Sequence, residues 1–88
     1  MSNIKSLIIT VQSGQKIQDG INLAVAGDTI RIMPGLYHET LSVDISGVVI
    51  EGVLKDGSRP ILDGKGKLAD GVIGSGSNIT LRNLIIRN

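Results

Sequence analysis

The side chains best suited to chemistry in this sequence are its single histidine and the glutamate that follows it. His38 and Glu39 are neighbours in the segment YHE, and an imidazole beside a carboxylate can act as an acid–base pair. In an extended strand, however, consecutive side chains point to opposite faces. The two groups therefore make a poor acid–base pair, and the sequence predicts that His38 is a surface residue.

The aspartates suggest a second kind of chemistry, which is calcium binding. A calcium ion needs several oxygen ligands that converge on it, and the spacing of Asp56, Asp63 and Asp70 is not that of a known calcium loop. These residues and Asp44 lie beside loops or corners, where aspartate commonly hydrogen-bonds its own backbone. Asp63 is also placed to pair with Arg87. We therefore expect no cofactor, with calcium as the alternative.

The glycine-rich segment GSGSN (74–78) resembles a phosphate-binding loop only in composition. The lysine and the helix that follow such a loop are missing. The segment is therefore predicted to be a corner between strands.

Composition limits the classes of function. The chain has 88 residues, enough for one small domain, with no cysteine, one aromatic residue and twelve glycines. Nine basic and eight acidic residues are interspersed. Without a basic stripe or stacking aromatics, nucleic-acid binding is not expected. No signal peptide is recognisable and no apolar run approaches the ~20 residues that cross a membrane, so the default expectation is a cytoplasmic protein without membrane contact.

The N-terminal part is expected to contain a strand and then a helix. Residues 6–12 (SLIITVQ) have the composition of a short strand. Residues 13–27 are predicted to form a helix with Ser13 as its N-cap and Gly27 at its end. The apolar face of this helix, at helical spacing, consists of Ile17, Ile21, Ala24 and Val25. Leu23 falls outside that face and is either a surface residue or a partner contact.

Beyond Gly27 the apolar residues alternate, and similar segments recur. Three of them are TIRIMPG (29–35), VVIEGV (48–53) and ITLRNL (79–84). Aligning them gives two apolar columns: Ile30, Val48 and Ile79, then Ile32, Ile50 and Leu81. A second pair of segments, at 60–64 and 84–88, aligns Ile61 with Ile85, Leu62 with Ile86 and Asp63 with Arg87. On the outer face, Glu51 beside Arg82 and Asp63 beside Arg87 would form ion pairs of up to ~1 kcal/mol each.

Repeated strands and corners with the same columns are typical of a solenoid. We expect an all-β fold, a parallel β-helix of about three coils, in a single domain at 1–88. Residues 28–88 would form the coils and the helix at 13–27 would cap them. The coils are expected to be right-handed, because crossovers between parallel strands nearly always are.

Several segments resemble the N-terminal part of right-handed parallel β-helix proteins of the pectin-lyase-like superfamily. They are IQDGINLA, GDTIRIMPGLYHETLSV, GVVIEG, PILDG and GSNITLRNLIIRN. The resemblance implies that the helix lies across the open end of the first coil and that Gly27–Asp28 leads into the first long strand. It also implies a corner at Pro34–Gly35 with Tyr37 packed beside it, and an outward-pointing Glu39.

Enzymes of that superfamily cleave acidic polysaccharides with clustered carboxylates on the outer face, in some cases with calcium. The outer columns of this chain carry no acidic pair or cluster; they hold Arg31, Met33, Val49, Glu51, Thr80 and Arg82. No catalytic residue can be transferred from the superfamily. We therefore do not expect this chain alone to be an enzyme.

Two functional hypotheses follow. The first is a non-enzymatic structural module that forms a homodimer or larger assembly through an uncapped last coil, with Leu84, Ile85 and Ile86 as candidate interface residues. The alternative is the N-terminal portion of a longer protein that binds or cleaves polysaccharides. In that case, outer-face residues Arg31, Glu51 and Arg82 would contact an acidic sugar chain.

Overall fold

The computed structural model describes residues 7–63, 72–73, 76 and 78–87. Within these ranges the protein consists mostly of short strands, with one short helix. The elements in chain order are β1 (Ile8–Val11), α1 (Ile17–Leu23), β2 (Thr29–Ile32), β3 (Leu36–Tyr37), β4 (Leu41–Ser42), β5 (Val49–Gly52), β6 (Ile61–Asp63), β7 (Val72–Ile73), β8 (Thr80–Arg82) and β9 (Ile85–Arg87). These strands pair in parallel throughout.

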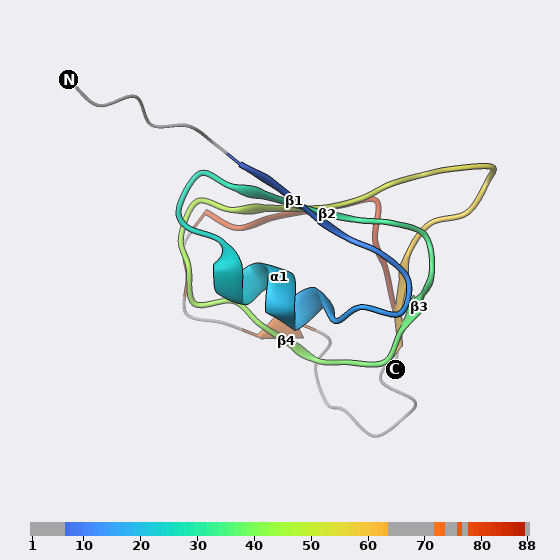
Figure 1. The fold of residues 1–88 in the computed structure, drawn as a ribbon. Coiled ribbons are helices and arrows are strands. Elements are labelled where there is room, and N and C mark those ends of the chain that lie inside the picture. The colour runs from blue at the N-terminus through green and yellow to red at the C-terminus, as the bar shows by residue number, and fades with distance from the viewer. Residues whose placement is uncertain (1–6, 64–71, 74–75, 77, 88) are drawn as a thin grey trace.

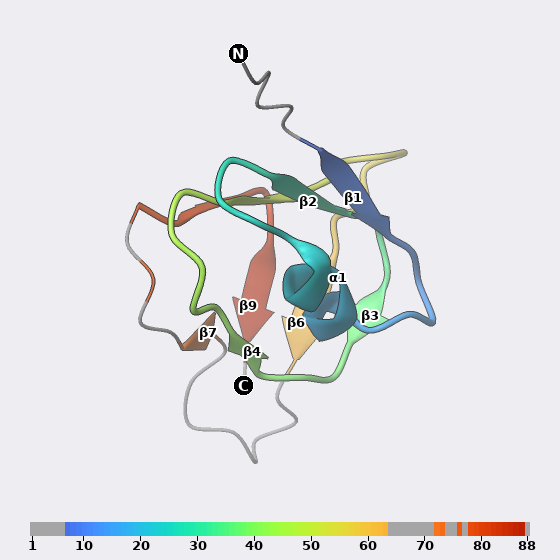
Figure 2. The ribbon, with the colours of Figure 1, turned by 60° about the vertical axis from the view of Figure 1, so that its left-hand side comes forward.

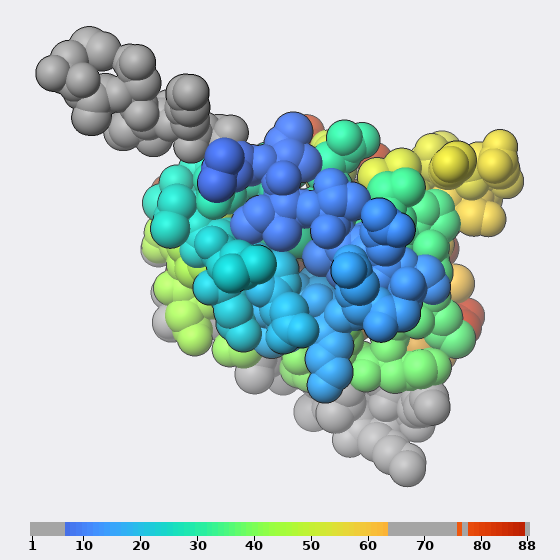
Figure 3. Space-filling view, viewed as in Figure 1, coloured from blue at the N-terminus to red at the C-terminus, as the bar shows by residue number. Residues whose placement is uncertain are grey.

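The strands form three sheets that the chain visits in turn. Sheet A has the strand order β1-β2-β5-β8, sheet B has the order β3-β6-β9, and sheet C pairs β4 with β7. From β2 onward the chain passes from sheet A to B to C and then returns to A one strand further along. Figures 1 and 2 show the three sheets around a central space. In Figure 3, β1 and α1 cover the face turned toward the viewer.

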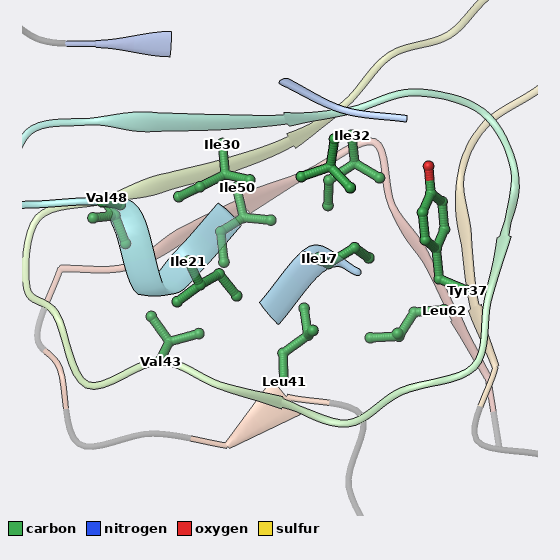
Figure 4. Packing of buried hydrophobic residues seen from close by; sticks show 12 residues of the cluster. Ile17, Ile21, Ile30, Ile32, Tyr37, Leu41, Val43, Val48, Ile50 and Leu62 are labelled. Atoms are coloured by element: carbon green, nitrogen blue, oxygen red, sulfur yellow. The ribbon is translucent and has the colours of Figure 1, made fainter. Parts of the chain in front are cut away.

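Aliphatic side chains from all three sheets and from α1 meet in the central space (Figure 4). Ile30 and Ile50 extend from sheet A, Leu62 from sheet B, Leu41 from sheet C and Ile17 from α1, and each is at most 1% exposed. Each strand is only two to four residues long. No single sheet could bury such a core alone, so the fold depends on all three sheets meeting.

The register of sheet A differs from the predicted one by two residues at β2. Ile50 lies opposite Leu81, as predicted. Ile32, which the alignment places in the same column, instead lies opposite Gly52, and Ile30 lies opposite Ile50. A two-residue shift leaves every side chain on its original face. Alternation of apolar and polar side chains therefore cannot fix this register.

The register of sheet B agrees with the prediction. β6 and β9 pair Ile61 with Ile85, Leu62 with Ile86 and Asp63 with Arg87. In both strands two aliphatic residues are followed by a charged one, and the charges are opposite. This shared pattern predicts the observed register.

The helix begins later than predicted, and a distant side chain caps it. α1 spans Ile17–Leu23 rather than 13–27, and its N-cap position is held by Lys16 rather than Ser13. The first two helical N–H groups, of Ile17 and Gln18, donate to the Glu39 carboxylate at 2.7 and 3.2 Å. These groups have no partner within the helix itself, so the carboxylate supplies one. The expectation that Glu39 points outward is therefore wrong.

The helix also ends earlier than predicted. Ile17, Ile21 and Ala24 face the core as predicted, whereas Val25 is 62% exposed. The backbone is already extended at Ala24, so Val25 does not continue the helical face. Leu23, predicted to lie off that face, is 74% exposed.

Gly20 allows α1 to pack directly on β1. A glycine inside a helix costs about 1 kcal/mol relative to alanine. A Cβ atom at Gly20 would lie 2.9 Å from Cγ2 of Val11 and 3.4 Å from Cγ2 of Ile9. The cost in helix propensity is thus offset by a closer approach of the helix to the strand.

A buried carboxylate joins the start of β1 to the loop after α1. Asp28 is 1% exposed, and its two oxygens accept hydrogen bonds from the N–H groups of Leu7 and Val25, both at 3.0 Å. The hydrogen bonds from Val25 and Leu7 hold the pKa of the Asp28 carboxyl below its ordinary value, although burial opposes this. Asp28 therefore acts as a structural clamp.

We expect this clamp to make stability depend on pH in the acid range. Because the pKa of Asp28 is lower in the folded state than in the unfolded state, the ionised form stabilises the fold. This contribution is fully present above the ordinary aspartate pKa of about 4 and is lost as the pH falls through the folded value. Melting curves from pH 7 to pH 2 should show Tm falling less steeply with acid for Asp28→Asn than for the wild type. If Tm fell equally steeply with acid in the two proteins, Asp28 would not be the source of this pH dependence.

Candidate functional site at the exposed end of sheets A and B

The three predicted ligand contacts on the outer face form one row across sheet A. Arg31 on β2 lies opposite Glu51 on β5, which lies opposite Arg82 on β8. The predicted ion pair is present, since Nη2 of Arg82 lies 3.5 Å from Oε1 of Glu51, with side chains 56% and 32% exposed. Arg31 is exposed and has no ion pair with another described residue. The row is thus one carboxylate between two guanidinium groups, a surface that could hold a single anionic group.

Two of the three calcium candidates, Asp56 and Asp63, lie in structural features of the described residues. Oδ2 of Asp63 accepts a hydrogen bond from Nε of Arg87 at 3.1 Å, which confirms the second predicted ion pair. Asp56 and Gly57, with φ angles of 51° and 77°, form the turn of a short hairpin. In the described ranges no group of three or more histidine or acidic residues is placed to hold a metal ion. Asp70 lies outside the described residues, as do three of the five residues of GSGSN (74–78).

The neighbouring pair His38 and Glu39 borders a pocket of about 460 Å³ between α1 and the segment joining β3 to β4. His38 is exposed, as predicted, and its Nδ1 lies 3.2 Å from the carbonyl oxygen of Asp63. Glu39 is committed to capping α1. Burial of the nearby Tyr37, together with the negative charge of Glu39, raises the pKa of the Tyr37 hydroxyl. His38 and Glu39 thus both make structural contacts, and the two side chains do not form an acid–base pair.

The residues with the clearest sign of a missing partner lie on the last strands of sheets A and B. Leu81 on β8 is 41% exposed, whereas Ile50, its partner one strand back, is fully buried. Ile86 on β9 is 43% exposed, whereas its partner Leu62 is 1% exposed. Ile85, on the same strand as Ile86, is 40% exposed, and its partner Ile61 is itself partly exposed. We call Leu81, Ile85 and Ile86 the exposed end.

Leu84, the third predicted interface residue, belongs partly to the core. It is only partly exposed and packs against the buried cluster. Sequence reasoning missed Leu81 as a member of the exposed end, because its column was expected to be covered like that of Ile50. The strand order, which places β8 last in sheet A, is what shows it to be uncovered.

The exposed end also offers backbone hydrogen-bonding groups. Among the described residues, β8 pairs only with β5 and β9 only with β6. A strand at the edge of a sheet has N–H and C=O groups that can pair with another strand. The exposed end therefore combines an apolar surface with two strand edges, which suits binding to another polypeptide.

A second group of exposed aliphatic residues lies at the opposite end of sheet A. Leu7, Ile8, Leu23 and Val25 are each more than half exposed. They belong to β1, the residue before it, and the C-terminal part of α1 and the loop after it. No described strand lies beyond β1 in sheet A, but here α1 fills the central space beside the strand.

Comparison with known proteins gives no independent guide to the site. The chain matches no protein-family model, and neither the curated proteins nor the solved structures contain a significant match to it. None of the described helical residues forms a helix long and apolar enough to cross a membrane.

Proposed function

We propose that this chain is a right-handed parallel β-helix module, similar to those of the pectin-lyase-like superfamily, with a structural role. In this proposal two copies associate through the exposed end. Parallel sheets that the chain visits in a fixed order support the β-helix assignment, as does the helix at the mouth of the first circuit. The sequence resemblance supports it in the same way.

The observation that carries the proposed function is the change in burial along single rows of side chains. In sheet A the row runs from Ile30 through Ile50 to Leu81, and the exposed fraction rises from 0% and 0% to 41%. All three residues are aliphatic, but only the first two are covered by neighbouring elements. Removing apolar surface from water is favourable by about 25 cal/mol per Å², so covering this end would release free energy.

The charges around the exposed end favour a second copy as the partner. The two basic side chains on the last strands are each paired with an acid one strand back, Arg82 with Glu51 and Arg87 with Asp63. Two identical ends can therefore meet without opposing uncompensated arginines. A two-fold axis would place the same patch on both sides of the interface and close the assembly at two copies.

We predict that Ile86→Lys prevents this association. A lysine ammonium group cannot be buried in an apolar interface without a large cost, but at a position already 43% exposed in the single chain it can reach water. Light scattering after size-exclusion chromatography should give about twice the chain mass of 9.2 kDa for the wild type and the single-chain mass for the variant. Circular dichroism should show the same strand content for both.

The matched control is Leu23→Lys, which also places a lysine on an exposed aliphatic position, but on α1 at the other end. This variant should keep the wild-type mass. The proposal fails if the wild type has the single-chain mass at high micromolar concentration, or if both lysine variants change the mass equally.

A second candidate function is binding of an acidic sugar chain to the outer face. The observation that favours it is the exposed Arg31, which has no ion pair with another described residue and lies in one row with Glu51 and Arg82. If the wild-type protein bound polygalacturonate or alginate and Arg31→Ala did not, the result would favour sugar binding over self-association. The row carries less weight than the exposed end, because Arg82 is already paired with Glu51.

A further inference from the structure

The side-chain amide of Gln18 occupies the edge of β4 that faces away from β7. The N–H group of Ser42 donates to Oε1 of Gln18 at 2.8 Å, and Nε2 of Gln18 donates to the carbonyl oxygen of Ser42 at 3.0 Å. One side-chain amide thus meets both backbone groups of a strand residue, as a peptide group of a neighbouring strand would. On the other side of β4, the carbonyl of Val43 accepts a hydrogen bond from Gly76.

Two contacts fix α1, the helix that carries Gln18. Glu39 accepts a hydrogen bond from the Gln18 backbone N–H, which fixes the start of α1. The buried side chain of Ile21 anchors the same helix in the core. Finally, Nε2 of Gln18 also donates to Oδ1 of Asn22 at 3.0 Å. The amide is therefore pre-positioned at the strand edge.

The two ends of the sheets are consequently different. At the exposed end, β8 and β9 are uncovered among the described residues. At the other end, α1 fills the central space (Figure 2), and the Gln18 side chain closes the edge of β4. If both ends could accept strands, copies could stack head to tail without limit, as heterologous contacts do.

We propose that Gln18 blocks addition of a strand to β4, and so disfavours pairing of copies through sheet C at the end opposite the exposed end. The inference rests on the proposed self-association for its biological meaning. The block itself is a local property of Gln18 and Ser42, and it can be tested whether or not the wild type is a dimer.

The test replaces Gln18 with methionine, which keeps the length of the side chain and removes both hydrogen bonds to Ser42. Gln18→Met is made in the wild type and in Ile86→Lys, where the exposed end is blocked. We expect a mass above that of the parent in both backgrounds, rising with concentration in sedimentation velocity. At a concentration low enough for the variant to be a single chain, we also expect hydrogen exchange of the Ser42 amide to be at least about tenfold faster than in a monomeric parent, as loss of a hydrogen bond worth about 1.4 kcal/mol would give. Asn22→Ala is the control, because it removes one partner of the Gln18 amide and leaves both bonds to Ser42 in place.

The two proposals fail separately. A wild type with single-chain mass refutes association at the exposed end, while a gain in mass on Gln18→Met would still support the block. Unchanged mass on Gln18→Met in both backgrounds overturns the block, even if Ser42 exchange becomes faster. Equal gains in mass for Gln18→Met and Asn22→Ala would also overturn it, because the control retains both contacts with the strand edge.

Discussion

Ile50→Ala should lower the free energy of unfolding by about 2–5 kcal/mol, the range for removing a large buried aliphatic side chain. Ile50 is fully buried and lies between Ile30 and Leu81 in sheet A. The cavity cannot close easily, because strands on both sides of β5 hold its backbone. Single domains are stable by only about 5–15 kcal/mol, so we expect a much lower urea midpoint for the variant.

Leu81→Ala is the matched comparison, since it removes a similar side chain from the same row. Leu81 is 41% exposed in the single chain, so the loss should be below about 1.5 kcal/mol when the protein is dilute. In the proposed dimer Leu81 becomes buried, and the loss should grow with protein concentration. Equal losses for both variants at low concentration would contradict the burial gradient that supports the proposed function.

Gly52→Ala should lower the free energy of unfolding by an amount similar to that of Ile50→Ala, for a steric reason. A Cβ atom at Gly52 would overlap the backbone carbonyl of Asn83 and lie 2.8 Å from Cγ of Pro60. Neither group is the free end of a flexible side chain, so the backbone of a corner must move. Overpacking typically costs 1–3 kcal/mol and occasionally more, and we expect about 3 kcal/mol here, measured by urea unfolding. The loss should be accompanied by faster hydrogen exchange in β8 and β9.

Gly57→Ala separates this steric effect from a backbone effect. Gly57 has a positive φ of 77°, but no atom lies within 4 Å of the position where a Cβ would stand. The left-handed conformation costs an alanine about 1–2 kcal/mol, and the cost should stay within the hairpin. If Gly57→Ala destabilised the protein as much as Gly52→Ala, close packing at the corner would not explain the glycine.

The sequence alone was sufficient for features that depend on local pattern. Alternating aliphatic residues predict short strands, and repeated segments predict their parallel pairing in sheet B, including the ion pair between Asp63 and Arg87. The pairing of β5 with β8 follows in the same way. These predictions succeed because side chains alternate along a strand, and because paired repeats in this chain match in both apolar and charged positions.

The register of β2 could not be obtained from the pattern. A shift of two residues keeps the same faces, so Ile32 and Ile30 were equally good partners for Ile50 on apolar character alone. The structure places Ile30 opposite Ile50 and Ile32 opposite Gly52, and neither the type of these residues nor their alternation predicts that choice.

Only the tertiary structure shows how α1 is held at one end of the sheets and which aliphatic residues are uncovered at the other. Glu39 reaches the start of α1 across 22 residues of chain, and Gln18 reaches Ser42 across 24. Neither pair has a local sequence signal, because the two groups of each pair meet only when β2 and β3, which lie between them in the chain, have taken their places in the sheets. Whether an aliphatic residue such as Leu81 is buried likewise depends on the strand beyond it rather than on its own type.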